Sequence, residues 1–167
     1  IIQDKLGLRR NIGALDFNLG CSGYVYGLSL AKGLISCGVA NSVLLLTGET
    51  YNKHLHPKDK GNRTIFGDAA SATVISTNGI SEIGDFSLGT DGSGADNLIV
   101  RSGGMRIPEK RCDLSFDENN NPVSSDYLYM NGAEIFTFTL DNVPPLIDDV
   151  LSKNGLAKDD IAVSYTH

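Results

Sequence analysis

The sequence predicts an α/β fold in which strands and helices alternate along the chain. Two strand-like runs, at residues 13–19 and 42–47, enclose a helical segment at residues 22–36. A third run of small and β-branched residues follows at 70–76, and a second helix begins at Asn131. A strand, a helix and a strand in this order indicate parallel strands joined by a right-handed crossover.

The composition fits one globular domain and excludes several kinds of partner. The chain has 167 residues, of which 41% are hydrophobic and 20% charged, enough for a core and too apolar for a disordered chain. Fourteen Lys and Arg against 20 Asp and Glu give a net charge of −6, which argues against a nucleic-acid binder. No apolar run approaches the ~20 residues of a membrane-spanning helix.

The cysteines and the start of the chain indicate its setting. Cys21, Cys37 and Cys112 are too few and too widely spaced for a disulfide framework, which predicts a reduced, cytoplasmic protein. The chain begins with Ile1 rather than Met and opens with no signal-like segment. We therefore expect it to be part of a longer protein.

The first half of the chain supplies the predicted crossover unit. Residues 1–8 suit the end of a helix, and residues 13–19 alternate like a strand. Apolar side chains at helical spacing run through residues 22–36, which predicts a largely buried helix closed by Gly38. The continuous apolar run at 42–47 is typical of a central strand covered on both faces.

The second half contains two more expected strands, at residues 83–88 and 160–165, and a long polar loop at 90–126. Asn131 followed by Glu134 predicts the start of a helix. Pro144 and Pro145 should kink or restart this helix, and Asn154–Gly155 should end it.

Cys21 is the strongest candidate for chemistry. It lies between a predicted strand and a predicted helix, flanked by Gly20, Ser22 and Gly23. This is the pattern of a nucleophile elbow. The helix N-terminus favours a thiolate there, and exposed backbone N–H groups stabilise an oxyanion. The alternative is a buried structural cysteine. Cys37 and Cys112 have no such setting, and we interpret both as structural.

A basic cluster forms the second candidate site. Its members are Lys53, His54, His56, Lys58, Lys60 and Arg63. The cluster suits either a solvated surface loop or a site for phosphates, such as those of coenzyme A or a carrier-protein arm. His54, His56 and Asp59 lack a further strong ligand at proper spacing, so we predict no metal site.

Four motifs along the chain resemble segments of one protein family. The segment DFNLGCSGY at residues 16–24 resembles the active-site cysteine segment of the 3-oxoacyl-acyl-carrier-protein synthase III family, and IFGDAA at 65–70 resembles its FGDGAGA segment. TDG at 90–92 and MNGAEIF at 130–136 follow in the family's order and spacing. The resemblance covers essentially the whole chain.

The resemblance implies a partial thiolase-like α/β fold, a mixed sheet layered between helices. Residues 1–125 would form the later part of the N-terminal half, which carries the cysteine nucleophile. Residues 126–167 would begin the C-terminal half. Roughly the first quarter of a family member and its last portion, which includes the catalytic Asn, would lie outside this chain.

The resemblance also implies a reaction. Cys21 would take an acyl group from acyl-coenzyme A, and decarboxylative Claisen condensation with malonyl-acyl-carrier protein would give a 3-oxoacyl product. His167 aligns with the catalytic His, although residues 163–167 also match a common sequencing adapter. Lys60 and Gly61 align with an Arg–Gly pair beside the coenzyme A nucleotide. No metal or cofactor would be needed beyond the coenzyme A thioester substrate, and the enzyme would be a homodimer.

Two alternatives remain open. Lys60 replaces an Arg, and Ala69 and Ser71 replace two family glycines, so the exact reaction can differ. The acyl group would then pass to an oxygen, nitrogen or sulfur acceptor without forming a carbon–carbon bond. The other alternative is a non-catalytic α/β subunit that only binds partners.

Overall fold

The computed structural model describes residues 1–164 of the chain. Its α-helices are α1 (Ile2–Lys5), α2 (Gly23–Ser36) and α3 (Gly132–Lys153). Its strands are β1 (Ser42–Thr50), β2 (Asp68–Ser76), β3 (Leu98–Ile99), β4 (Ser115–Phe116), β5 (Pro122–Val123) and β6 (Tyr129–Met130). Short 3-10 turns lie at Tyr51–His54, Asn62–Thr64, Ala95–Asn97 and Lys158–Asp160.

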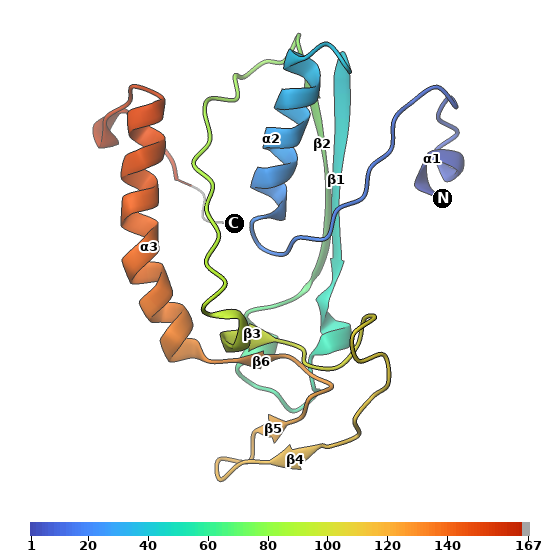
Figure 1. Cartoon of the computed structure of the whole chain (residues 1–167), viewed down its shortest axis with the longest axis vertical. Helices are drawn as coiled ribbons and strands as arrows, with labels where there is room; N and C mark the ends of the chain where they lie inside the picture. Colours follow the sequence, from blue (N-terminus) through green and yellow to red (C-terminus); the bar gives the residue numbers. More distant parts are fainter. Residues whose placement is uncertain (165–167) are drawn as a thin grey trace.

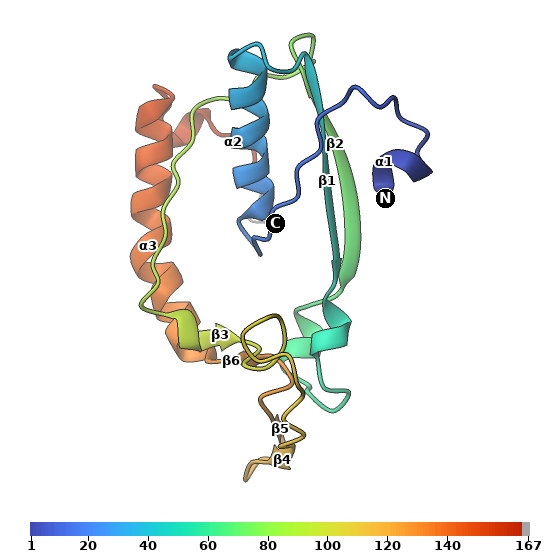
Figure 2. The same cartoon turned by 45° about the vertical axis from the view of Figure 1, so that its right-hand side comes forward.

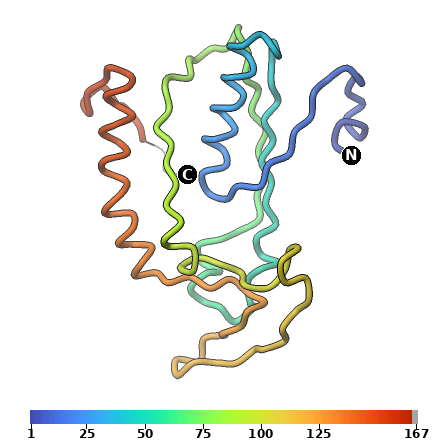
Figure 3. The backbone as a smooth tube through the Cα atoms, viewed as in Figure 1, coloured from blue at the N-terminus to red at the C-terminus, as the bar shows by residue number. Residues whose placement is uncertain are grey.

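The long strands β1 and β2 pair in antiparallel register, from Ser42 opposite Ser76 to Thr50 opposite Asp68. Helix α2 lies along this pair, while α3 stands to one side and the short strands lie below (Figure 1). The expected parallel crossover is wrong for the described residues. Residues 13–19 form no strand and run as an extended segment into α2 (Figure 3). The alternation of apolar and polar residues predicts an extended backbone, but a β-strand also needs a hydrogen-bonded neighbouring strand.

The core sits between α2 and the β1–β2 pair. Its buried members are Ala31, Leu45 and Ile75. Gly27 lets α2 pack closely against β1, because a Cβ at this position would lie only 2.7 Å from the Leu45 Cδ1 atom. Small residues on the inner face of α2 therefore set how closely the helix packs on the strands.

Two burial expectations are wrong. Helix α2 buries only Gly23, Gly27 and Ala31 among its residues, rather than most of its surface. Strand β1 buries Leu45 but leaves Leu44 45% exposed, so it is not covered on both faces. Within residues 1–164, the helical cover lies on one side of β1 and β2, and the apolar residues on the other side stay accessible.

The helix ends agree with the sequence. Gly38 has φ +72° just after α2, and Gly155 has φ +64° just after α3, the left-handed conformation that glycine adopts readily. The Asn131 Oδ1 atom accepts a hydrogen bond from the Glu134 N–H at 3.3 Å, as expected for an N-cap. Pro144 and Pro145 lie inside α3, and the expected restart of the helix is absent.

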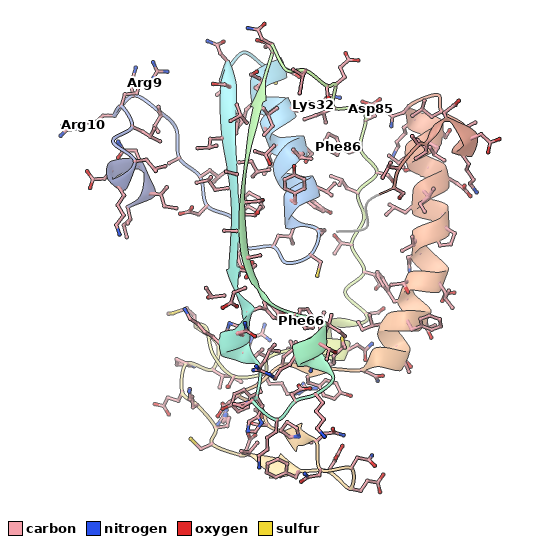
Figure 4. All side chains as sticks on the ribbon, turned by 180° about the vertical axis from the view of Figure 1, so that it is seen from behind. Arg9, Arg10, Lys32, Phe66, Asp85 and Phe86 are labelled. Carbon is pink, nitrogen blue, oxygen red and sulfur yellow. The ribbon has the colours of Figure 1, made fainter. Side chains whose placement is uncertain are left out.

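The segment at residues 83–88 was expected to be a strand but forms none. Polar side chains hold it between the two long helices instead, and Figure 4 shows Lys32, Asp85 and Phe86 in this region. The Lys32 Nζ atom donates to the Gly84 carbonyl at 2.9 Å. Asn154 accepts from the Asp85 N–H at 2.7 Å and donates to the Asp85 carbonyl at 3.1 Å.

The long polar segment at residues 90–126 contains more structure than the expected loop. Strands β3 and β6 pair with each other, and β4 and β5 form a second antiparallel pair. Asp126 accepts from the Arg111 and Cys112 N–H groups at 2.8 and 2.9 Å. Hydrogen bonds from Ser125 and Ser124 lower the pKa of Asp113 to about 2. The carboxylates of Asp113 and Asp126 therefore accept hydrogen bonds that join the two ends of the β4–β5 hairpin.

The end of the described chain has no strand. Residues Lys158–Asp160 form a 3-10 turn, and residues 161–164 are not part of any ladder. The strand predicted over 160–165 is therefore absent up to residue 164. Tyr165 and His167 lie outside the described residues.

Candidate active site

Cys21 lies in the turn immediately before α2, as the sequence predicted. The Gly23 N–H donates to the Gly20 carbonyl at 2.8 Å and closes this turn. Gly23 is buried, and a Cβ added there would lie 3.7 Å from the Leu19 Cβ atom. The Gly20–Gly23 hydrogen bond thus closes the turn, and a Cβ at Gly23 would make only an ordinary van der Waals contact.

The Cys21 thiol is exposed, so the alternative of a buried structural cysteine is wrong. Cys37 and Cys112 are exposed as well, so exposure does not single out Cys21. The position of Cys21 does single it out, because the positive end of the 14-residue helix α2 lies next to the Cys21 sulfur. Within residues 1–164 the Cys21 and Ser22 N–H groups donate no hydrogen bond, which leaves both available to an oxyanion.

Tyr51 is a partly buried residue near the end of β1 that the sequence analysis did not select. It follows β1 directly, and its ring stacks on Phe66 with centroids 4.8 Å apart. Burial raises the pKa of Tyr51, and the negative charges of Cys21 and Glu49 raise it further. The only sequence signal was an aromatic residue directly after a strand, which is too common to identify a site.

The basic loop after β1 is folded rather than simply solvated. His56 and Asn62 are buried in it. The His56 Nδ1 atom accepts from the Lys58 N–H at 3.2 Å, and the Asn62 side chain donates to Asp59 at 2.7 Å. Leu128 donates its N–H to the His54 carbonyl at 2.8 Å. The loop is therefore anchored to the segment that leads into β6.

Lys60 lines a polar cavity of about 340 Å³. Its lining residues are Pro57, Lys58, Lys60, Asn119, Asn120 and Asn121. Phe116 of β4 holds the hairpin against the loop, with its ring 5.4 Å from the Lys58 ammonium and 6.1 Å from the His56 ring. Gly61 does not line this cavity; its carbonyl accepts from the Thr64 hydroxyl at 2.8 Å.

The described residues give no support for a metal centre. Within residues 1–164, no group of three or more His, Cys, Asp or Glu side chains could hold a metal ion. In the same part of the chain, the helices are too short or too polar to cross a membrane.

Comparisons with known proteins agree on one family. Residues 15–92 match the family model described as 3-oxoacyl-[acyl-carrier-protein (ACP)] synthase III. A beta-ketoacyl-[acyl-carrier-protein] synthase III from Clostridium perfringens (strain 13 / Type A) is 36% identical over 100% of this chain and 49% of its own length. A putative 3-oxoacyl-[acyl-carrier-protein] synthase 3 from Campylobacter jejuni is also 36% identical, over 99% of this chain and 47% of its own.

Solved structures show the same relationship. A crystal structure of a 3-oxoacyl-(acyl-carrier-protein) synthase III is 49% identical, with a TM-score of 0.89, over 96% of this chain and 49% of that one. A 3-oxoacyl-(acyl-carrier protein) synthase from Burkholderia xenovorans LB400 is 41% identical, with a TM-score of 0.78, over 95% of this chain and 44% of that one.

The fold and these likenesses define an α/β protein with a partial thiolase-like fold. Over essentially its whole length the chain is similar to members of the 3-oxoacyl-[acyl-carrier-protein] synthase III family. It spans about half the length of the curated relatives that it matches.

Proposed function

We propose that the protein carrying this chain is a condensing enzyme that uses Cys21 as its nucleophile. The observation that carries this proposal is the exposed thiol in the tight turn before α2. The Cys21 sulfur attacks the carbonyl carbon of an acyl-coenzyme A, a new S–C bond forms, and the coenzyme A thiolate leaves. The Cys21 and Ser22 N–H groups, which donate no hydrogen bond within residues 1–164, are then available to the developing oxyanion.

The second half of the proposed reaction forms a carbon–carbon bond. Malonyl-acyl-carrier protein loses carbon dioxide, and the resulting carbanion attacks the acyl-cysteine carbonyl. The Cys21 thiolate leaves, and the product is a 3-oxoacyl-acyl-carrier protein. We assign His167 to the decarboxylation step on the family resemblance alone, together with an Asn outside this chain.

The test is direct. The full-length protein is incubated with acyl-coenzyme A, and its tryptic peptides are weighed. An acyl mass on the peptide of residues 11–32, which contains Cys21, is the expected result, followed by a 3-oxoacyl product when malonyl-carrier protein is added. No acyl mass on that peptide would overturn the proposal.

A second outcome supports the acyltransferase alternative. Ala69 and Ser71 lie on β2 opposite Glu49 and Thr47, where they replace two family glycines. Normal acylation of Cys21 without a new carbon–carbon bond would favour transfer to an oxygen, nitrogen or sulfur acceptor. An inert Cys21 would favour the non-catalytic subunit.

We further propose that Lys60 binds the phosphates of coenzyme A, with Gly61 beside it. The cavity lining supports this assignment, because it contains two lysines and no acidic side chain. Lys60→Ala should raise KM for acyl-coenzyme A about two- to fivefold, the size of an exposed ion pair, and leave kcat unchanged. Steady-state kinetics at low and high salt check this, because screening should shrink the difference.

Lys53→Ala is the matched control for this measurement. Lys53 belongs to the same basic stretch but does not line the cavity. An equal rise in KM in both variants would indicate a general charge effect and contradict a specific role for Lys60.

We also propose the setting of the enzyme. Acyl-coenzyme A and acyl carrier protein are its partners, and two copies form a homodimer. No metal or organic cofactor takes part, so dialysis against a chelator should leave activity intact. A cytoplasmic location suits three free thiols. The division at residue 125 between two thiolase-like halves stays a prediction.

A further inference from the structure

The β4–β5 hairpin and the loop between β1 and β2 meet at one end of the molecule, the lower end in Figures 1 and 2. The polar cavity of about 340 Å³ that Lys60 lines has one wall from each of these segments. The loop contributes Pro57, Lys58 and Lys60, and the hairpin tip contributes Asn119, Asn120 and Asn121. The cavity therefore joins two segments that lie far apart in the sequence.

Ring contacts pack the two walls together. The Phe116 ring of the hairpin lies 5.4 Å from the Lys58 ammonium and 6.1 Å from the ring of the buried His56. The His56 ring also meets the Tyr127 ring edge-on at 5.0 Å, and the His56 Nδ1 atom accepts from the Lys58 N–H at 3.2 Å. These contacts fix the position of Lys58 relative to the hairpin.

The hairpin tip has an ordered backbone and two available amides. Asp117 Oδ1 accepts from the Asn119 and Asn121 N–H groups at 2.9 and 2.8 Å, and Asp117 Oδ2 accepts from the Asn121 side chain at 3.1 Å. Asn120 has φ +61°, a left-handed conformation that Asn adopts more readily than most residues. Within residues 1–164, the Asn119 and Asn120 side chains form no hydrogen bond, so both amides are available to a ligand.

The charges in the cavity favour an anion. Its lining carries two ammonium groups and three amides but no carboxylate, although the chain as a whole has a net charge of −6. Asp59 and Asp117 are neighbours in the sequence, yet neither lines the cavity. Asp59 accepts instead from the Asn62 side chain at 2.7 Å. Ammonium and amide N–H donors suit the oxygens of a phosphate group.

We propose that the hairpin tip completes the coenzyme A site. The Lys58 ammonium and the Asn119 and Asn120 side-chain N–H groups bind the phosphates of the nucleotide together with Lys60. This inference rests on the proposed role of Lys60. The hairpin thereby selects thioesters of coenzyme A over thioesters of pantetheine, which carry no phosphate.

The experiment measures binding of the nucleotide alone, so it does not depend on Cys21. The full-length protein is titrated with adenosine 3′,5′-bisphosphate, the nucleotide part of coenzyme A, in a calorimeter. Asn119→Asp and Asn120→Asp place a carboxylate in the cavity with almost no change in side-chain size. Each should raise Kd about three- to fivefold, as should Lys58→Ala, the scale of one exposed charge pair. The differences should shrink at high salt.

Steady-state kinetics test the selectivity. In both hairpin variants, KM for acyl-coenzyme A should rise by the same factor as Kd, while kcat stays unchanged. KM for an acyl-pantetheine thioester should not change, because this substrate has no phosphate to place in the cavity. A variant that only disturbed the fold would alter both substrates alike.

Asn52→Asp is the matched control. It makes the same exchange in the turn that follows β1, outside the cavity lining, and should leave Kd unchanged. An equal rise in Asn52→Asp, or no rise in either hairpin variant, would overturn the inference. A loss of affinity in Lys60→Ala alone would keep the proposed role of Lys60 and reject that of the hairpin. Failure of Cys21 to accept an acyl group would instead overturn the proposed function, and the titration would still report on the hairpin.

Discussion

Cys21→Ala in the full-length protein is expected to abolish acylation by acyl-coenzyme A and to lower condensation at least about 10³-fold, the scale of losing a catalytic nucleophile. The variant keeps the turn and the helix but removes the sulfur that forms the acyl bond. Because the side chain is exposed, the free energy of unfolding should change by less than about 0.5 kcal/mol. Mass spectrometry of the acylated peptide and a product assay check the two activities.

Cys37→Ala serves as the control for this change. Cys37 is also exposed, but it caps the opposite, C-terminal end of α2. Its removal should leave acylation and condensation unchanged. Full condensation by Cys21→Ala would show that another group is the nucleophile.

Leu45→Ala is expected to have the largest effect on stability. Leu45 is 7% exposed and belongs to the core between α2 and the strands. Truncating a buried leucine costs its transfer free energy and leaves a cavity, so the free energy of unfolding of the 167-residue chain should fall by about 2–5 kcal/mol. Urea denaturation followed by circular dichroism measures the loss.

Leu44→Ala tests whether burial causes this loss. Leu44 is the preceding residue of β1 and is 45% exposed on the other face of the strand. Its truncation should cost less than about 1 kcal/mol, because only half of the side chain leaves water on folding. Equal losses in the two variants would contradict a core placed only on the α2 side of β1.

The features that the sequence predicted correctly are local ones. Helix α2, its closing Gly38, and the Asn131 cap of α3 all depend on residues within a few positions of one another. The turn that carries Cys21 belongs to the same group, because Gly20 and Gly23 close it. The candidate nucleophile could therefore be found without a structure.

The predictions that failed depend on distant partners. Residues 13–19 and 83–88 have strand-like patterns, but no neighbouring strand pairs with them within residues 1–164. The sequence cannot distinguish an extended segment from a strand, because the difference lies in hydrogen bonds to another part of the chain. The prediction that β1 is covered on both faces failed for a similar reason. An apolar run does not indicate which face of a strand another element covers.

The sequence by itself determined the α/β class, the helix ends and the identity of the nucleophile candidate. Only the tertiary structure brought Asn119–Asn121 against Lys58 and Lys60. Helix caps and tight turns are stabilised by contacts between near neighbours. A cavity lined by segments that lie far apart in the sequence forms only when the chain folds and brings those segments together.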